Sequence, residues 1–242
     1  GLTQLDLGGN QTTDISALAG LSGLTHLQLY NNQITDISAL AGLTGLTELY
    51  LGENEITDIS ALAGLSGLTQ LDLRRNQITD ISALAGLSEL TDLRISNNQI
   101  TDISALDGLK QLTFLNAIDN NITRLPESII DLGIQIDVEK ESAYLWQDKG
   151  IFLHGNPIET PPPEIVRKGR EAIKAYFQAL KGKPQPVNEV KVLLVGDGGA
   201  GKTSLTKCLR GLQFDEEEEK TDGINIEAWQ IEDGSRNIKV NL

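Results

Sequence analysis

A 22-residue period runs through the first half of the chain and constrains its fold more than any other feature. An asparagine closes each period, at the end of a phrase of the form L-x-x-L-x-L-x-x-N or a close variant of it. These residues are Asn10, Asn32, Asn54, Asn76, Asn98 and Asn120. No single unit of this length can bury its own apolar stripe, so consecutive units are expected to stack into a solenoid with one continuous core.

The phrase matches the signature of leucine-rich repeats. Each unit predicts one short strand whose leucines point into the coil, followed by a turn at the asparagine. The I-T-D-I-S-A-L segment predicts a return along the back as a 3₁₀ or short helical turn. Beyond Asn120 the pattern degrades, because Ile136-x-Val138 lacks the asparagine, and Ile151-x-Leu153-x-x-Asn156 predicts the last unit. We therefore predict a leucine-rich-repeat domain over residues 1–158.

Function in such a solenoid is expected at the variable positions that face outward on the concave sheet. Apolar or aromatic side chains at these positions indicate a protein partner. The predicted partner-binding surface consists of Tyr30, Tyr50, Arg74, Arg94, Phe114 and Ile118. The alternative is a solvated surface of mixed character without a ligand.

Composition excludes several classes of function. The net charge is −14, and residues 1–150 carry 20 acidic against 7 basic side chains, which argues against nucleic acid as a partner. No apolar run of about 18 residues is present, so no membrane span is predicted. The single cysteine, Cys208, fits a reducing, cytoplasmic compartment. The chain lacks methionine and opens inside a repeat, from which we expect a fragment of a longer protein.

Residues 159–188 predict a Pro-rich and helical linker. The ETPPP segment at 159–163 ends the repeats, and Pro163 suits the first turn of a helix. Apolar residues then follow helical spacing from Ile165 to Leu180. A helix this apolar must pack on something, either the end of the repeats or the next domain. Its outer side is basic, which leaves a helix lying on a membrane surface as the rival interpretation.

The segment G-D-G-G-A-G-K-T at 196–203 is a phosphate-binding loop in its expected context. An apolar strand is predicted before it at 190–195, and a helix after it at 204–210. The glycines allow backbone N–H groups to converge on phosphates, Lys202 supplies a cation, and the Thr203 hydroxyl suits Mg²⁺. The residues predicted to bind nucleotide are Gly196, Asp197, Gly198, Gly199, Ala200, Gly201, Lys202, Thr203 and Ser204. This loop alone does not distinguish ATP from GTP.

Three features in this order resemble the bacterial Roco proteins: the repeats, the linker PPPEIV…GREAIKAYFQAL, and KVLLVGDGGAGKTSLTKCLRG followed by TDGINIEAWQI. The resemblance implies an α/β chain with a leucine-rich-repeat solenoid, parallel strands on its concave face, and the N-terminal part of a Ras-like Roc GTPase domain at 189–242. It implies GTP or GDP with Mg²⁺ as cofactors, and it gives Thr221 the switch I role of a Mg²⁺ and γ-phosphate ligand. It also implies a homodimer of the full-length protein through a COR domain outside this chain.

Two functions follow from these features. The first is a regulatory GTPase whose nucleotide state is linked to a protein-binding ladder, active in the full-length protein and inactive in this fragment. The second is a leucine-rich-repeat recognition scaffold with an ATP-binding or structural phosphate loop. The residues leave the group that positions the attacking water unassigned.

Overall fold

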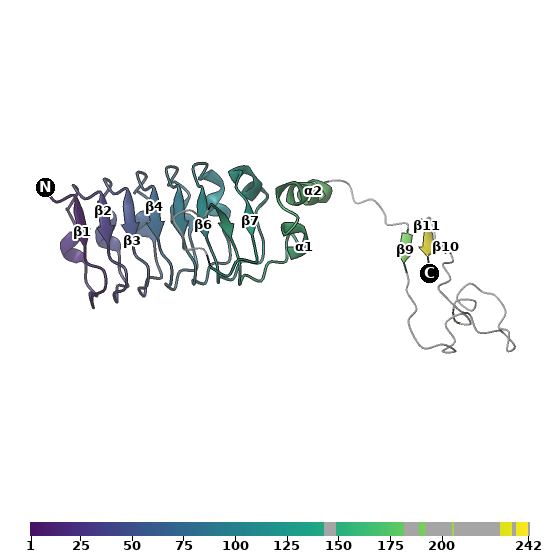
Figure 1. The fold of residues 1–242 in the computed structure, drawn as a ribbon, viewed down its shortest axis with the longest axis horizontal. Helices are drawn as coiled ribbons and strands as arrows, with labels where there is room; N and C mark the ends of the chain where they lie inside the picture. Colours follow the sequence, from purple (N-terminus) through teal and green to yellow (C-terminus); the bar gives the residue numbers. More distant parts are fainter. Residues whose placement is uncertain (143–148, 182–188, 192–204, 206–227, 234–235, 242) are drawn as a thin grey trace. The chain divides into compact units, whose positions relative to one another are not determined.

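The computed structural model describes residues 1–142, 149–181, 189–191, 205, 228–233 and 236–241. The chain divides into two compact units, Gly1–Lys181 and Gly182–Leu242, and each is described by itself (Figure 1). The first unit holds the repeats, and the described part of the second contains three strands.

A parallel sheet of eight short strands forms one side of the first unit. The first six strands pair with their neighbours 22 residues apart, as in Gln4↔His26 and Leu27↔Leu49, so the repeat period sets their register directly. The central leucine of β2 and that of β3 are fully buried, and these leucines stack into the core. The strands are β1 (Gln4–Asp6), β2 (His26–Gln28), β3 (Glu48–Tyr50), β4 (Gln70–Asp72), β5 (Asp92–Arg94), β6 (Phe114–Asn116), β7 (Ile136–Asp137) and β8 (Gly150–Phe152).

Short 3₁₀ helices return the chain along the opposite side, as the I-T-D-I-S-A-L segment predicted. The Asp14 carboxylate accepts the N–H of Ser16 at 2.8 Å, and the next four repeats have an equivalent bond, from Asp36, Asp58, Asp80 and Asp102. The carboxylate thus satisfies a backbone N–H of the first helical turn, which has no acceptor within the helix. The helices are η1 (Ser16–Leu18), η2 (Ser38–Leu40), η3 (Ser60–Leu62), η4 (Ser82–Leu84), η5 (Ser104–Gly108) and η6 (Glu127–Leu132).

The repeated asparagines form a ladder of side-chain hydrogen bonds inside the turns. Asn76 Oδ1 accepts the N–H of Ile56, while its Nδ2 donates to the carbonyls of Leu51, Leu73 and Arg74 at 3.0, 3.0 and 3.3 Å. The side chain thus joins its own turn to the preceding repeat. The residue before each of these asparagines has a positive φ, and the non-glycine examples are Asn31, Glu53, Arg75, Asn97 and Asp119.

The last two strands do not follow chain order. β6 pairs with β8, and β7 lies beyond β8 at the edge of the sheet. Asn156 supplies the reason, because its Oδ1 accepts the N–H of Ile122, 34 residues earlier, where the other repeats span 20. The unit at 151–156 therefore continues the ladder directly from β6, and the segment that contains β7 is an insertion.

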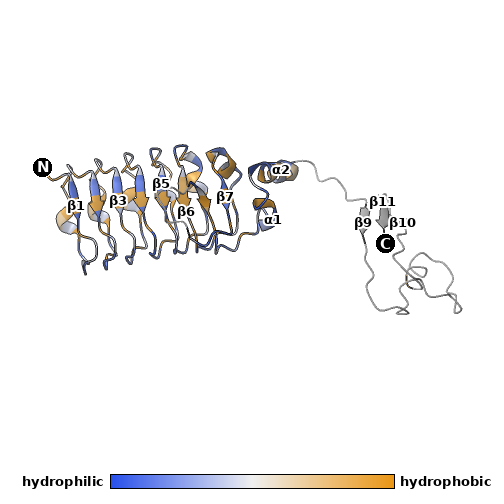
Figure 2. Ribbon diagram, viewed as in Figure 1, coloured by the Kyte–Doolittle hydropathy of each residue, from blue (hydrophilic) through white to orange (hydrophobic). Residues whose placement is uncertain are grey.

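Two helices close the end of the repeat core. These are α1 (Pro163–Val166), which begins at the predicted proline, and α2 (Arg170–Lys181). Val166, Ile173 and Phe177 are buried in the same cluster as the repeat leucines, and α2 shows one hydrophobic and one hydrophilic side (Figure 2). Lys181 also binds Glu127 of η6 at 2.7 Å. The sequence left two packing partners open for this helix, the end of the repeats or the next domain. The structure shows α2 packed on the end of the repeats.

The second unit contains β9 (Glu189–Lys191), β10 (Ala228–Asp233) and β11 (Arg236–Asn241). β10 and β11 are antiparallel, and β9 pairs in parallel with β11 in the order β10-β11-β9. β9 covers the start of the strand predicted at 190–195. A parallel pair requires a crossover connection, so residues 192–227 link β9 to the β10–β11 hairpin.

Candidate functional site

The candidate site among the described residues is the outer sheet face, where the sequence predicted a concave binding surface. We use this name for the side chains of β1 to β6 that point away from the leucine core, together with the residue two positions after each strand. They alternate with buried leucines, as a pleated strand requires. They include Asp6, Gly8, His26, Gln28, Tyr30, Glu48, Tyr50, Gly52, Gln70, Asp72, Arg74, Asp92, Arg94, Phe114, Asn116 and Ile118.

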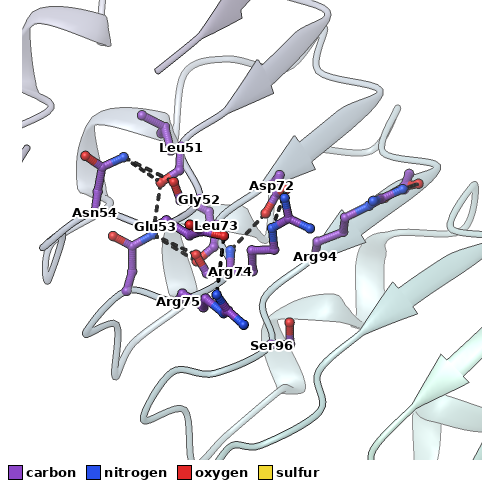
Figure 3. Close-up of polar contacts among 12 residues, drawn as sticks. Leu51, Gly52, Glu53, Asn54, Asp72, Leu73, Arg74, Arg75, Arg94 and Ser96 are labelled. Carbon is purple, nitrogen blue, oxygen red and sulfur yellow. Dashed lines mark hydrogen bonds and ion pairs between the residues drawn. The ribbon is translucent and has the colours of Figure 1, made fainter. Parts of the chain in front are cut away.

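A buried carboxylate lies at the centre of this face (Figure 3). Asp72 accepts the N–H of Arg74 at 3.0 Å, and Arg74 Nε lies 3.2 Å from Asp72 Oδ2. This contact has the distance of an ion pair, but Nε is buried and lacks the alignment of a hydrogen bond. Burial raises the pKa of Asp72, and the charge of Arg74 opposes that shift.

Arg74 can lie in this position because Gly52 has no side chain. A Cβ at Gly52 would come within 3.0 Å of Arg74 Cγ and 3.1 Å of Asp72 Oδ1. The Arg74 side chain therefore lies across the preceding repeat, and a larger residue at position 52 would have to displace it. The glycine is part of the site although it carries no functional group.

Tyr50 is held by two polar neighbours. Its hydroxyl lies 3.1 Å from Glu48 Oε2 and 2.9 Å from Gln70 Oε1, within hydrogen-bond distance of both. Burial and then the charge of Glu48 raise the pKa of Tyr50 to about 12. The phenol is thus neutral and fixed in orientation.

Arg94 and Phe114 form the next part of the face. Arg94 donates from Nε and Nη2 to the two oxygens of Asp92, both at 3.0 Å, and its guanidinium lies 5.3 Å from the centre of the Phe114 ring. These hydrogen bonds raise the pKa of Arg94. The fork geometry keeps the guanidinium against the ring.

Phe114 and Ile118 correct the sequence analysis, which expected both side chains to be exposed. They are 4% and 3% exposed and form a separate small cluster with Phe152. The Phe114 and Phe152 rings are 5.6 Å apart, and Lys140 lies 4.9 Å from the centre of the Phe152 ring. Sequence reasoning missed Phe152 because its strand, β8, lies next to β6 only since β7 is displaced to the edge of the sheet.

Tyr30 has the opposite environment. Its side chain remains 38% exposed, and a Cβ at Gly8 would collide with its ring. Since the ring lies over the glycine of the preceding repeat, it is supported from below and open to solvent. Of the six predicted partner-binding residues, the structure leaves Tyr30, Tyr50, Arg74 and Arg94 at least partly accessible. Their role in binding stays a prediction.

The predicted nucleotide site lies outside the residues that the structure describes. This applies to Gly196, Asp197, Gly198, Gly199, Ala200, Gly201, Lys202, Thr203, Ser204 and Thr221. The described strand β9 ends at Lys191, shortly before this loop. Within the described ranges, no group of His, Cys, Asp and Glu has the arrangement of a metal site. The same ranges contain no helix that could cross a bilayer.

Two family models match the chain. The model of leucine-rich repeats, in pairs of copies, matches residues 1–42, 44–86 and 88–130, which is more than half of the chain. The model described as "Ras of Complex, Roc, domain of DAPkinase" matches residues 191–242, which contain the phosphate loop. The repeats therefore precede a Roc domain.

Curated relatives share short segments with this chain. A probable serine/threonine-protein kinase, pats1, of Dictyostelium discoideum is 35% identical over 86 residues, which are 32% of this chain and 2% of that protein. A Roc-COR-CHAT protease of an unknown prokaryotic organism is 25% identical over 125 residues, which are 45% of this chain and 11% of that protein. The chain thus spans a small part of the length of these relatives.

Solved structures resemble the repeats. A leucine-rich-repeat protein of Leptospira interrogans has a TM-score of 0.52 at 27% identity, covering 69% of this chain and 46% of that one. An internalin of Listeria monocytogenes has a TM-score of 0.50 at 34% identity, covering 64% and 48%. The plant peptide hormone receptor RGFR1, solved in complex with RGF2, has a TM-score of 0.50 at 26% identity, covering 62% and 25%. The Roc domain after the repeats gives the chain the architecture of a bacterial Roco-like protein. Together with the sheet and the asparagine ladder, the matches to the repeats show that the chain belongs to the leucine-rich-repeat family.

Proposed function

We propose that this chain is the recognition and switch part of a regulatory Roco GTPase. In this proposal the repeats bind a protein partner, and the Roc domain binds GTP with Mg²⁺ and hydrolyses GTP in the full-length protein. The observation that carries the proposal is the order of the two matches: the repeats come first, and the Roc match at 191–242 contains G-x-x-x-x-G-K-T.

The chain's own residues have distinct roles in this proposal. Backbone N–H groups of 196–203 and the Lys202 ammonium bind the phosphates. The Thr203 hydroxyl and, by its likeness to switch I, Thr221 hold the Mg²⁺ ion. A Mg²⁺ ion held there would supply positive charge against the negative charge of the phosphates. Thr221 contacts the γ-phosphate only in the GTP state, which makes its segment the switch.

The strand pairing of the second unit supports this assignment. Because β9 and β11 are parallel, the phosphate loop falls in the crossover that leaves the carboxyl end of β9. Ligands of α/β sheets bind outside the carboxyl ends of parallel strands. In the chain the loop follows the carboxyl end of β9, and this order supports the proposed nucleotide site.

Solved relatives support a protein partner for the repeats. RGFR1 was solved in complex with RGF2, and another plant receptor kinase ectodomain, at 25% identity and a TM-score of 0.51, was solved in complex with CASPARIAN STRIP INTEGRITY FACTOR 2. We assign partner recognition in this chain to the accessible part of the outer sheet face. Homodimerisation through a COR domain and a cytoplasmic location belong to the same proposal and rest on the resemblance to Roco proteins.

The test is nucleotide affinity in the protein that carries the complete Roc domain. Equilibrium titration is expected to show Mg·GTP binding at least tenfold tighter than Mg·ATP, and Lys202→Ala is expected to abolish binding. Lys207→Ala is the matched control, because Lys207 lies outside the motif. Equal affinity for the two nucleotides would contradict the GTPase assignment and favour the ATP-binding or structural loop.

A further inference from the structure

The positive charges of the repeat domain are unevenly placed along the ladder. Residues 1–73 contain eight Asp and Glu side chains and no Lys or Arg, so Arg74 is the first cation in the chain apart from the N-terminus. The first three repeats are therefore a continuous region of negative charge. Such a field raises the local concentration of cationic ligands and speeds their association.

On the outer sheet face this asymmetry separates two kinds of carboxylate. Asp72 and Asp92 in the fourth and fifth repeats each pair with an arginine. Asp6 and Glu48 in the first three repeats have no Lys or Arg against them in the described structure. Asp6 accepts the N–H of Gly8 at 2.8 Å, and Glu48 lies 3.2 Å from the His26 ring and within reach of the Tyr50 hydroxyl.

A tyrosine lies near each of these carboxylates: the Tyr30 ring lies over Gly8, whose N–H Asp6 accepts, and the Tyr50 hydroxyl lies 3.1 Å from Glu48 Oε2. Gln28 pairs with Tyr50, and Tyr30 follows Gln28 by two residues, so the two tyrosines occupy diagonal positions on the same face. The Tyr30 ring is open to solvent above Gly8, and Tyr50 is oriented by Glu48 and Gln70. Tyrosine faces attract ammonium and guanidinium groups, and a nearby carboxylate adds a direct partner for the charge.

We propose that the outer sheet face of the first three repeats binds a linear, arginine- or lysine-bearing segment of a protein partner. In this inference Tyr30 with Asp6, and Tyr50 with Glu48, contact cationic side chains of the segment, and the two carboxylates balance their charge. It deepens the proposed function, on which it rests, by naming the chemistry that the repeats select. The arginines of the next two repeats set the limit of this region, because their carboxylate partners are already neutralised.

The experiment uses a random 12-residue linear peptide library displayed on phage and selected on the immobilised full chain. A selected peptide is then synthesised, and its affinity for the variants is measured by fluorescence anisotropy. Tyr30→Ser removes the open ring, and Glu48→Gln removes one charge from the face. Asp58→Asn is the matched control, because it removes the same charge beside η3 and keeps the oxygen that Ser60 needs.

Enrichment of arginine and lysine is expected, with Tyr30→Ser and Glu48→Gln each weakening affinity at least fivefold and Asp58→Asn less than twofold. Equal weakening by Asp58→Asn and Glu48→Gln overturns the proposal, because the attraction would then be general. Selection of uncharged or acidic peptides that still depend on Tyr30 also overturns it, but leaves protein recognition by this face intact. If no peptide is enriched, or if neither Tyr30→Ser nor Glu48→Gln weakens the selected peptides, the result contradicts both the cationic-segment proposal and protein recognition by this face.

Discussion

The asparagine ladder gives the sharpest quantitative prediction, the effect of Asn76→Ala. The side chain is 7% exposed and makes four hydrogen bonds across two repeats. Its removal leaves the N–H of Ile56 buried without a partner, because alanine offers no acceptor. A buried polar group left in this way costs about 1–3 kcal/mol.

The donated bonds add to this cost. The two shorter ones, to Leu51 and Leu73, contribute about 1 kcal/mol each to the net stability. The expected loss in the free energy of unfolding is therefore about 3–5 kcal/mol, above the range of most single substitutions. Asn10→Ala is the matched control, since Asn10 is exposed and bonds only Leu7 and Gly8 of its own turn, and it should cost about 1 kcal/mol or less.

The assay is urea unfolding of the full chain at 25 °C, followed by far-ultraviolet circular dichroism and analysed at a common slope. Asn76→Ala should shift the midpoint markedly, and Asn10→Ala only slightly. If the two variants lose the same stability, the bonds that join repeats do not hold the ladder together, and the reasoning is refuted.

Three further predictions concern the cap and the titrating groups. Phe177→Ala should lower the free energy of unfolding in urea by about 3–5 kcal/mol, because Phe177 closes the repeat core. Leu180→Ala is the control and should cost little, since Leu180 is 59% exposed. Equal losses in the two variants would show that α2 is not a cap. Because burial raises the pKa of Tyr50 to about 12, stability should fall between about pH 10 and 12 as the unfolded phenol ionises first, and Tyr50→Phe should reduce this fall. The hydrogen bond from Ser60 lowers the pKa of Asp58, so its stabilisation should be lost as pH falls below about 3.8, and an unchanged acid transition in Asp58→Ala would contradict this.

The repeat fold was predictable because its signals are local and repeated. The leucine phrase, the asparagine turn and the 3₁₀ return each recur at 22 residues, and the structure confirms all three. The recognition of leucine-rich repeats before a Roc domain is likewise confirmed. The domain boundaries near residues 158 and 188, by contrast, stay predictions.

The environment of Phe114 was not predictable from its own repeat. Its position faces outward, as the pattern indicated, but Phe152 comes from a strand that lies next to β6 only because β7 is displaced. The sequence also left open what α2 packs against. Its apolar face predicts that the helix is buried, but it does not identify the surface that covers it. Both outcomes depend on contacts between distant segments.

The proposed function implies that the repeats and the nucleotide switch act on one another. The most direct measurement is amide hydrogen exchange over residues 1–181 in the protein with the complete Roc domain, loaded with Mg·GDP or with Mg²⁺ and a non-hydrolysable GTP analogue. We expect α2 to exchange at different rates in the two states, and the difference to vanish in Lys202→Ala. Identical exchange over 1–181 in both states, with loading verified, would contradict the claim.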